Sequence, residues 1–264
     1  MATNLENTNS TLKFTLPSGY YVEIREMNGE DDDVLTNKFN QQNLEHHTNF
    51  LSTIIVDTNL PMNINGKISK EAALDILLND KYVILFYSRI FSIDPIIKFP
   101  YLWVKPDGTK DEVMYEDDLN DYVWDFSKQV PLEGEEGYKE YRVKQYAGGA
   151  YDKITYNLAS GKEVRFGLLN TKSERILAKS LIDQTYSITK DLISRGLELN
   201  VEGKWMLVEN FKMFSKKDMN ELYKATSMVD PTFLGISELL YEPTGETIKI
   251  NLITLTDFFF PEEI

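Results

Sequence analysis

The chain lacks cysteine altogether and has very little histidine. Without cysteine there are no disulfides, no thiolate metal sites and no thiol nucleophile, and the redox compartment cannot be inferred. The two histidines, His46 and His47, are adjacent. Neighbouring side chains on a helix point about 100° apart, so this pair cannot face one ion as an i, i+4 pair does. We expect a solvated or capping role for them and no metal site.

Basic charge and long apolar runs are also scarce. There are 42 acidic and 28 basic residues, which gives a formal net charge of −14. Proteins that bind the phosphate backbone need the opposite sign, so nucleic acid is not an expected partner. The first ten residues are polar and no apolar run is long enough to span a bilayer, so we expect no membrane partner and no secretion by the general route.

Catalytic signatures are the next absence. No nucleophile, phosphate-loop or hydrolase motif is present, and the Gly66-Lys67 and Gly203-Lys204 pairs lack the upstream glycine of a phosphate loop. Three carboxylates beside a tight turn, Asp107, Asp111 and Glu112, lack the spacing of a calcium loop. We therefore predict no enzymatic activity, no cofactor and no metal. Acid–base catalysis by paired carboxylates stays open, because the chain has so many of them.

What the chain does contain is a collinear internal repeat. The block Leu16-Pro17-Ser18-Gly19 recurs as Leu158-Ala159-Ser160-Gly161, 142 positions later. Blocks that begin at Leu60, Asp94 and Lys105 recur in the same order at offsets of 136 or 137. Chance matches would not remain collinear, so the pattern predicts two related units that arose by duplication.

Each unit is predicted to begin with a β-hairpin and a capped helix. Apolar and polar residues alternate over 11–15 and 20–26 in the first copy, and over 153–157 and 163–168 in the second. The Ser18-Gly19 and Ser160-Gly161 turns separate these strands, with glycine supplying a positive φ. Capping pairs then follow at Asn28 with Asp31, and at Thr171 with Glu174.

The middle of each unit is predicted to be helical but to differ in polarity. Ser69 caps a run to Phe86 that is apolar nearly all round and is therefore expected to be buried. The corresponding stretch, Trp205 to Met228, carries more charge, and we expect a more exposed or shorter helix there. An amphipathic stripe from Ile176 to Leu192 precedes it. The first copy is thus predicted to be a buried anchor and the second an exposed docking surface.

Each unit is predicted to close with a second hairpin. The turns contain Pro106 and Gly108 in the first copy, and Pro243 and Gly245 in the second. We regard the four hairpin turns as candidate interaction positions. The phenylalanine run near the C-terminus is a further candidate if it is exposed, because such a patch usually binds a partner: Phe258, Phe259 and Phe260.

The predicted fold class is α+β, with two tandem related units. A polar arm covers residues 1–10, the first unit 11–130, a linker 131–150 and the second unit 151–264. The linker assignment depends on the glutamate- and glycine-rich stretch Glu133 to Gly137 and on Gly148-Gly149. Each unit is of ordinary domain size and can bury a core of its own.

Two stretches of the first unit resemble a known family. The hairpin Leu16-Pro17-Ser18-Gly19-x-x-Val22-x-Ile24-Arg25-x-Met27, with the acidic helix start behind it, resembles the T4-type phage baseplate hub and hub-assembly protein family. The stretch Asn79-Asp80-Lys81-x-x-Ile84-Leu85-x-x-x-Arg89-x-x-Ser92 is similar to the same family's Asp-(Arg/Lys)…Arg…Ser helix. Where that family's next ribbon often carries Cys-x-x-Cys, this chain has Trp103-Val104-Lys105-Pro106, which argues against zinc.

The resemblance implies a non-enzymatic structural or assembly protein of a tailed-phage virion, in the tail, baseplate or neck. It implies a location in the virion, and in the host cytoplasm during assembly. The implied partners are other phage structural proteins, with self-association in a symmetric assembly as a further form of contact. Two alternatives remain: an assembly chaperone absent from the mature particle, and an enzyme with a carboxylate site in the cleft between the units.

Overall fold

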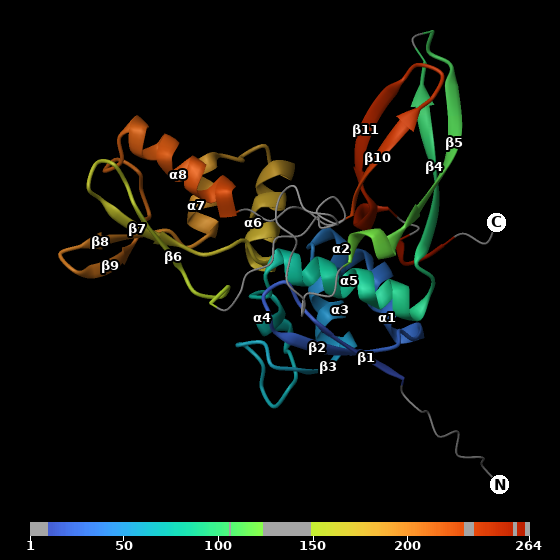
Figure 1. Ribbon diagram of the computed structural model, residues 1–264, viewed down its shortest axis with the longest axis horizontal. Helices are drawn as coiled ribbons and strands as arrows, with labels where there is room; N and C mark the ends of the chain where they lie inside the picture. Colours follow the sequence, from blue (N-terminus) through green and yellow to red (C-terminus); the bar gives the residue numbers. More distant parts are fainter. Residues whose placement is uncertain (1–9, 106, 124–148, 230–234, 256–257, 262–264) are drawn as a thin grey trace, which may run out of the picture.

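The computed structural model describes residues 10–105, 107–123, 149–229, 235–255 and 258–261. These residues form an α+β fold with eight α-helices and several small antiparallel sheets (Figure 1). The first half of the chain forms β1 (Thr11–Thr15), β2 (Tyr21–Arg25), α1 (Gly29–Thr36), α2 (Lys38–Gln42), α3 (His46–Ile54), β3 (Ile55–Thr58), α4 (Lys70–Ala73), α5 (Leu78–Ser92), β4 (Ile96–Val104) and β5 (Lys110–Asp118).

The second half forms a similar series of elements. It contains β6 (Ile154–Asn157), β7 (Glu163–Phe166), α6 (Thr171–Ile182), α7 (Ile188–Ser194), β8 (Glu198–Val201), β9 (Lys204–Leu207), α8 (Lys216–Val229), β10 (Ile236–Tyr241) and β11 (Glu246–Asn251). Short 3-10 helices follow the closing hairpins, at Leu119–Tyr122 and Leu252–Thr254.

In the first half, a three-stranded antiparallel sheet packs against α5. The strands lie in the order β1-β2-β3, and Thr11 pairs with Arg25 at the open end of the first hairpin. The turn into α1 is a capping box, as predicted: the Asn28 side chain accepts from a backbone N–H of α1, and Asp31 accepts from the Asn28 N–H at 2.9 Å. Arg25 also contacts Asp31 through two hydrogen bonds of 2.6 and 2.8 Å, which fix the sheet to the helix.

The second half has a separate core. Its sheet has the order β6-β7-β8-β9, and buried side chains of this sheet pack with Leu192 of α7 and Leu222 of α8. The start of α6 is joined to the start of α5 by backbone hydrogen bonds. The Leu78 N–H donates to Leu169 O at 3.0 Å, and the Thr171 N–H donates to Ile76 O at 2.9 Å. The two halves therefore meet at the beginnings of α5 and α6.

The two closing hairpins lie side by side, although they come from different halves. Figure 1 shows β4–β5 and β10–β11 projecting together from the body, away from the sheet of the second half. The rings of Trp103 and Tyr241 stack with centroids 4.9 Å apart, and Tyr115 donates to Leu240 O at 2.9 Å. Tyr241 and Leu239 consequently belong to the core of the first half.

Four local predictions were wrong. Ser69 caps only the short helix α4, and the predicted run to Phe86 is interrupted before α5 begins at Leu78. The cap of α6 is Asn170, one residue before the predicted Thr171, because the Asn170 side chain accepts from the Ser173 N–H. Residues after Trp205 do not begin a helix; they continue β9, which pairs with β8. The apolar stripe after Ile176 is interrupted between α6 and α7. Most of the predicted linker lies outside the described residues.

Candidate functional site

The first Ser-Gly turn is hydrogen-bonded to the start of α5. Ser18 is buried, and its N–H donates to Asp80 Oδ1 at 3.0 Å. The other carboxylate oxygen of Asp80 accepts from the Tyr151 hydroxyl at 2.8 Å. Gly19 has φ of +84°, as the turn requires. This predicted interaction turn is thus also the point where the first hairpin, α5 and the start of the second half meet.

Burial controls the ionisation of Asp80. The side chain is fully buried, and desolvation raises its pKa to about 6, although hydrogen bonds from Ser18 and Tyr151 oppose the shift. A buried carboxyl group whose pKa is raised is one mark of an active site. Here both oxygens are occupied by protein donors within the fold, so the arrangement is that of a structural joint.

The second Ser-Gly turn is held in a similar way by α8. Asp218, in the first turn of α8, accepts from Lys162 Nζ and from the Ser215 N–H, both at 2.9 Å. Hydrogen bonds from Ser160 and Lys162 hold the pKa of Asp218 well below its ordinary value. Ser160 and Gly161 are exposed, unlike Ser18. The contact between the Ser-Gly turn and an aspartate is therefore buried at the turn serine in the first half, whereas the turn serine is exposed in the second.

The turns of the closing hairpins lie at the exposed tip of the projection. Gly108 and Gly245 have positive φ values of +84° and +71°, and Pro243 is exposed. Pro106 lies outside the described residues. Between the two tips, Asp111 accepts from the Tyr241 hydroxyl at 2.6 Å and lies 3.5 Å from Lys105 Nζ. The tip is thus polar and internally paired.

The phenylalanine run belongs mainly to the core. Phe258 is fully buried and Phe259 is 7% exposed, while Phe260 is half-buried. The Phe258 ring lies 5.2 Å from that of Phe86 on α5, and its carbonyl accepts from the buried Arg89 guanidinium. The run therefore attaches the C-terminal segment to α5, and it does not form an exposed patch.

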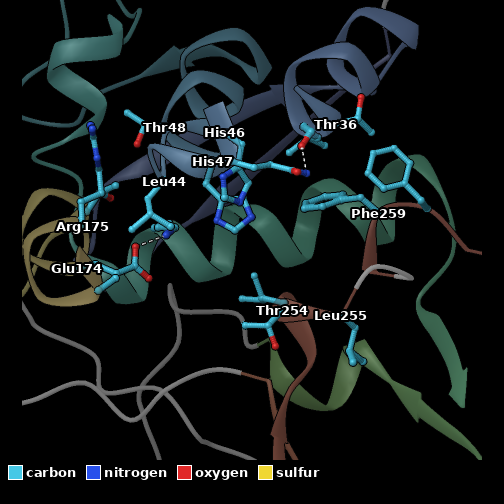
Figure 2. A pocket seen from close by; sticks show the side chains of 17 residues that line it. Thr36, Leu44, His46, His47, Thr48, Glu174, Arg175, Thr254, Leu255 and Phe259 are labelled. Atoms are coloured by element: carbon cyan, nitrogen blue, oxygen red, sulfur yellow. Dashed lines mark hydrogen bonds and ion pairs between the residues drawn. The ribbon is translucent and has the colours of Figure 1, made fainter. Parts of the chain in front are cut away.

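A cavity of about 470 Å³ lies where the two halves and this C-terminal segment meet. The start of α3, the end of α1, the first turns of α6 and the stretch around Leu255 surround it (Figure 2). Its volume is in the range of small-molecule sites. Sequence analysis missed it, because its walls come from segments more than 200 residues apart.

We call this cavity the boundary pocket. The charged groups around it are paired. Lys81 forms an ion pair with Glu174, whose other oxygen accepts from the Tyr82 hydroxyl at 2.9 Å. Arg175 contacts Glu45 at 2.7 Å. Desolvation, reinforced by the nearby Lys81 charge, lowers the pKa of His46 and His47, so both imidazoles are neutral at physiological pH. Their ring centroids are 4.1 Å apart.

Six exposed apolar side chains lie on α6, α7 and the turn between them. Leu181 and Ile182 are 62% and 70% exposed. We call the full set the α6–α7 apolar residues: Ile176, Leu181, Ile182, Tyr186, Ile188 and Ile193. Exposed apolar groups that gather on one surface often mark a contact site.

The described residues contain no cluster of three or more metal-ligating side chains. Within the same ranges, no helix is both long and apolar enough to cross a bilayer. Comparison with known proteins gives no matching family model, no matching curated protein and no matching solved structure. The arguments for function consequently come from the chain itself.

Two residues that hold the Ser-Gly turns escaped sequence analysis for different reasons. Tyr151 has no motif around it, and only the fold brings it to Asp80. Asp218 has a signal that a closer comparison of the two copies would find, because it occupies the same place in α8 that Asp80 occupies in α5. Both carboxylates contact the Ser-Gly turn of their own half.

Proposed function

We propose that the protein is a non-enzymatic structural or assembly component of a tailed-phage virion, in the tail, baseplate or neck, and that it acts through protein contacts. The observation that carries the proposal is the exposed set of α6–α7 apolar residues. Six large apolar side chains exposed on two neighbouring helices are costly in water, and covering them with a partner is favourable.

The resemblance to the baseplate hub and hub-assembly family supports the assignment to a phage. The residues that carry it have related structural duties in this chain: Asp80 holds the hairpin turn, Arg89 binds the Phe258 and Ile96 carbonyls, and the Ser92 hydroxyl accepts from the Met27 N–H at 2.9 Å. These residues join elements that lie far apart in the chain, so they belong to the framework of this fold.

We also infer that the two halves arose by duplication. Both begin with a hairpin whose second strand pairs with a later strand, β3 or β8. Both place an aspartate of a later helix, α5 or α8, against the Ser-Gly turn, and both end in a hairpin and a short 3-10 helix. A duplicated chain presents two related surfaces, which suits contacts within a symmetric assembly.

The enzyme alternative has less support. It requires two carboxylates with opposed pKa shifts in the cleft between the halves. Among the residues that line the boundary pocket, the carboxylate is Glu174, and it is paired with Lys81 and Tyr82. Asp80 and Asp218 do have opposed shifts, but they lie in different halves, each within its own joint.

Mass spectrometry of purified particles from the encoding phage tests the proposal. We expect the chain to be present in particles, and the isolated protein to capture tail proteins in a pull-down. Capture without presence in particles would instead identify an assembly chaperone. A stable monomer that captures no tail protein and is absent from particles would contradict both forms of the proposal.

A further inference from the structure

Charge is divided unevenly along the chain. Residues 149–229, which form the body of the second half, contain 13 basic and 10 acidic side chains, a net charge of +3. All other residues together contain 15 basic and 32 acidic side chains, a net charge of −17. The overall charge of −14 therefore includes a positive region, which attracts a negative surface wherever one comes close to it.

The positive charge gathers on the solvent face of α8. Buried Leu222 and Ala225 lie on its opposite face. Among the residues that the structure describes, the lysines of the solvent face have no ion-pair partner. We call them, with one exposed lysine just before the helix, the α8 lysines: Lys212, Lys216, Lys217 and Lys224.

The carboxylates of α8 do not neutralise these lysines. Asp218 is buried and forms an ion pair with Lys162 at 2.9 Å. Glu221 accepts from the Ala159 N–H at 2.7 Å. Both carboxylates are therefore used to hold the second Ser-Gly hairpin, and the α8 lysines are left to solvent.

The first half exposes the opposite charge on α1. Glu30, Asp32 and Asp33 are exposed, and we call them the α1 carboxylates. None of the three forms an ion pair with another described residue; the ion pair of this helix joins the buried Asp31 to Arg25. The α1 carboxylates thus lack a counter-ion, as the α8 lysines do.

Each charged surface also has an exposed apolar side chain beside it. Phe39, three residues beyond the end of α1, is 69% exposed. Met213, next to Lys212, is 46% exposed. Surface ion pairs alone contribute little free energy, so a stable contact needs apolar area as well. Both sides supply it.

The two surfaces cannot neutralise each other within one chain. Figure 1 shows α8 toward one end of the longest axis of the molecule and α1 toward the other, and the cores of both halves lie between them. Salt screens exposed charges beyond roughly 8 Å at physiological ionic strength. Complementary charges at opposite ends can meet only between copies.

From this arrangement we infer that the α8 lysines dock on the α1 carboxylates of a second copy of the chain. The two surfaces are different patches, so copies associate head to tail, with Met213 of one copy close to Phe39 of the next. This contact is independent of the phage assignment, because the chain itself is the partner. It also involves none of the α6–α7 apolar residues.

Analytical ultracentrifugation of the purified full-length chain tests the inference. At low salt the weight-average mass should rise with protein concentration above the 30.5 kDa of one chain. In roughly 1 M salt, where the screening length is about 3 Å, the mass should return to that of one chain.

Charge reversal on either side should weaken self-association roughly tenfold or more. One variant combines Lys216→Glu, Lys217→Glu and Lys224→Glu, and the other combines Glu30→Lys, Asp32→Lys and Asp33→Lys. An equimolar mixture of the two variants should associate again. In that mixture the reversed α8 meets the reversed α1, and the native α8 meets the native α1, so both contacts join opposite charges.

A matched control separates the docking contact from a change in overall charge. Lys67→Glu, Lys70→Glu and Lys249→Glu alter the net charge of the chain as much as the α8 variant does, at exposed lysines outside α8. This control should weaken self-association by less than about twofold. Circular dichroism checks that each variant is folded.

A wild-type chain that stays monomeric at low salt would overturn the inference, whatever the variants do. So would self-association that persists in high salt, a mixture of the two folded variants that stays monomeric, or a control that loses as much association as the α8 variant.

Discussion

Helices α5 and α8 occupy corresponding places in the two halves, yet their surroundings differ sharply. Eleven of the fifteen residues of α5 are buried, whereas four of the fourteen residues of α8 are. The difference comes from what each half packs against. The C-terminal segment packs on α5 through Phe258, and the start of α6 is hydrogen-bonded to the start of α5.

The two halves differ in which parts of the chain pack against them. The first half receives the closing hairpin and the C-terminal segment of the second, and so becomes the common core. The closing hairpin of the second half does not pack in the core of that half, which is smaller. Its helices α6 and α7 retain their exposed apolar residues. The first half therefore anchors the chain, and we expect the second to make external contacts.

The largest expected difference comes from truncating one residue of each helix. Phe86 is fully buried and contacts Phe258, so Phe86→Ala should lower the free energy of unfolding by about 3–5 kcal/mol. Lys224 is the position of α8 that corresponds to Phe86, because the same spacing relates Asp218 to Asp80, and it is exposed. Lys224→Ala should therefore change the free energy of unfolding by less than about 0.5 kcal/mol. Urea unfolding followed by circular dichroism measures both. Equal losses of stability in the two variants would contradict the difference in burial between α5 and α8.

Opposite pH dependence is the next expected contrast. The pKa of Asp80 is raised, so the folded state binds a proton more tightly and wild-type stability falls, relative to Asp80→Asn, as pH rises from about 4 to about 6. The full change is about 3 kcal/mol for a shift of about two pH units. The pKa of Asp218 is lowered, so wild type gains relative to Asp218→Asn as pH rises through the ordinary aspartate range.

Urea unfolding of the three proteins between pH 3 and pH 7 gives these differences directly. Two difference curves of the same sign would contradict the opposed environments of the two joints. The exposed turn at Ser160 and the buried turn at Ser18 would then behave alike.

Removing an ion pair between α5 and α6 should lower the stability by a smaller amount. Lys81 is nearly buried, so Glu174→Gln leaves its ammonium without a counter-ion and should cost about 2–3 kcal/mol. Glu45→Gln removes the partner of Arg175 in a more exposed pair and should cost less than about 1 kcal/mol. Thermal unfolding of both variants at one pH checks the order. A reversed order would place the main link between the halves elsewhere.

The smallest effect on stability is expected at the proposed contact surface. Leu181→Ser combined with Ile182→Ser replaces two exposed side chains and should change the free energy of unfolding by no more than about 0.5 kcal/mol per site. The variant should nevertheless lose capture of tail proteins. Lost stability with retained capture would show that these residues are structural.

Local features of the fold were predictable, and long-range ones were not. The Ser18-Gly19 turn and the Asn28 cap depend on neighbouring residues, so strand alternation and capping chemistry identified them. The strand after Lys204 is too short for periodicity to distinguish it from a helix. The contact of Tyr241 with Trp103 depends on packing between segments far apart in the chain. The boundary pocket depends on the same kind of packing.

Cross-linking mass spectrometry of the protein with phage tail proteins tests the division into anchor and contact surface most directly. Lys172, Lys179 and Lys190 lie on α6 and α7, next to the exposed apolar residues. We predict that cross-links to partners concentrate at these lysines, and that Leu181→Ser with Ile182→Ser removes them. Partner cross-links concentrated instead at first-half lysines such as Lys13 and Lys67, and unchanged in the variant, would contradict the account.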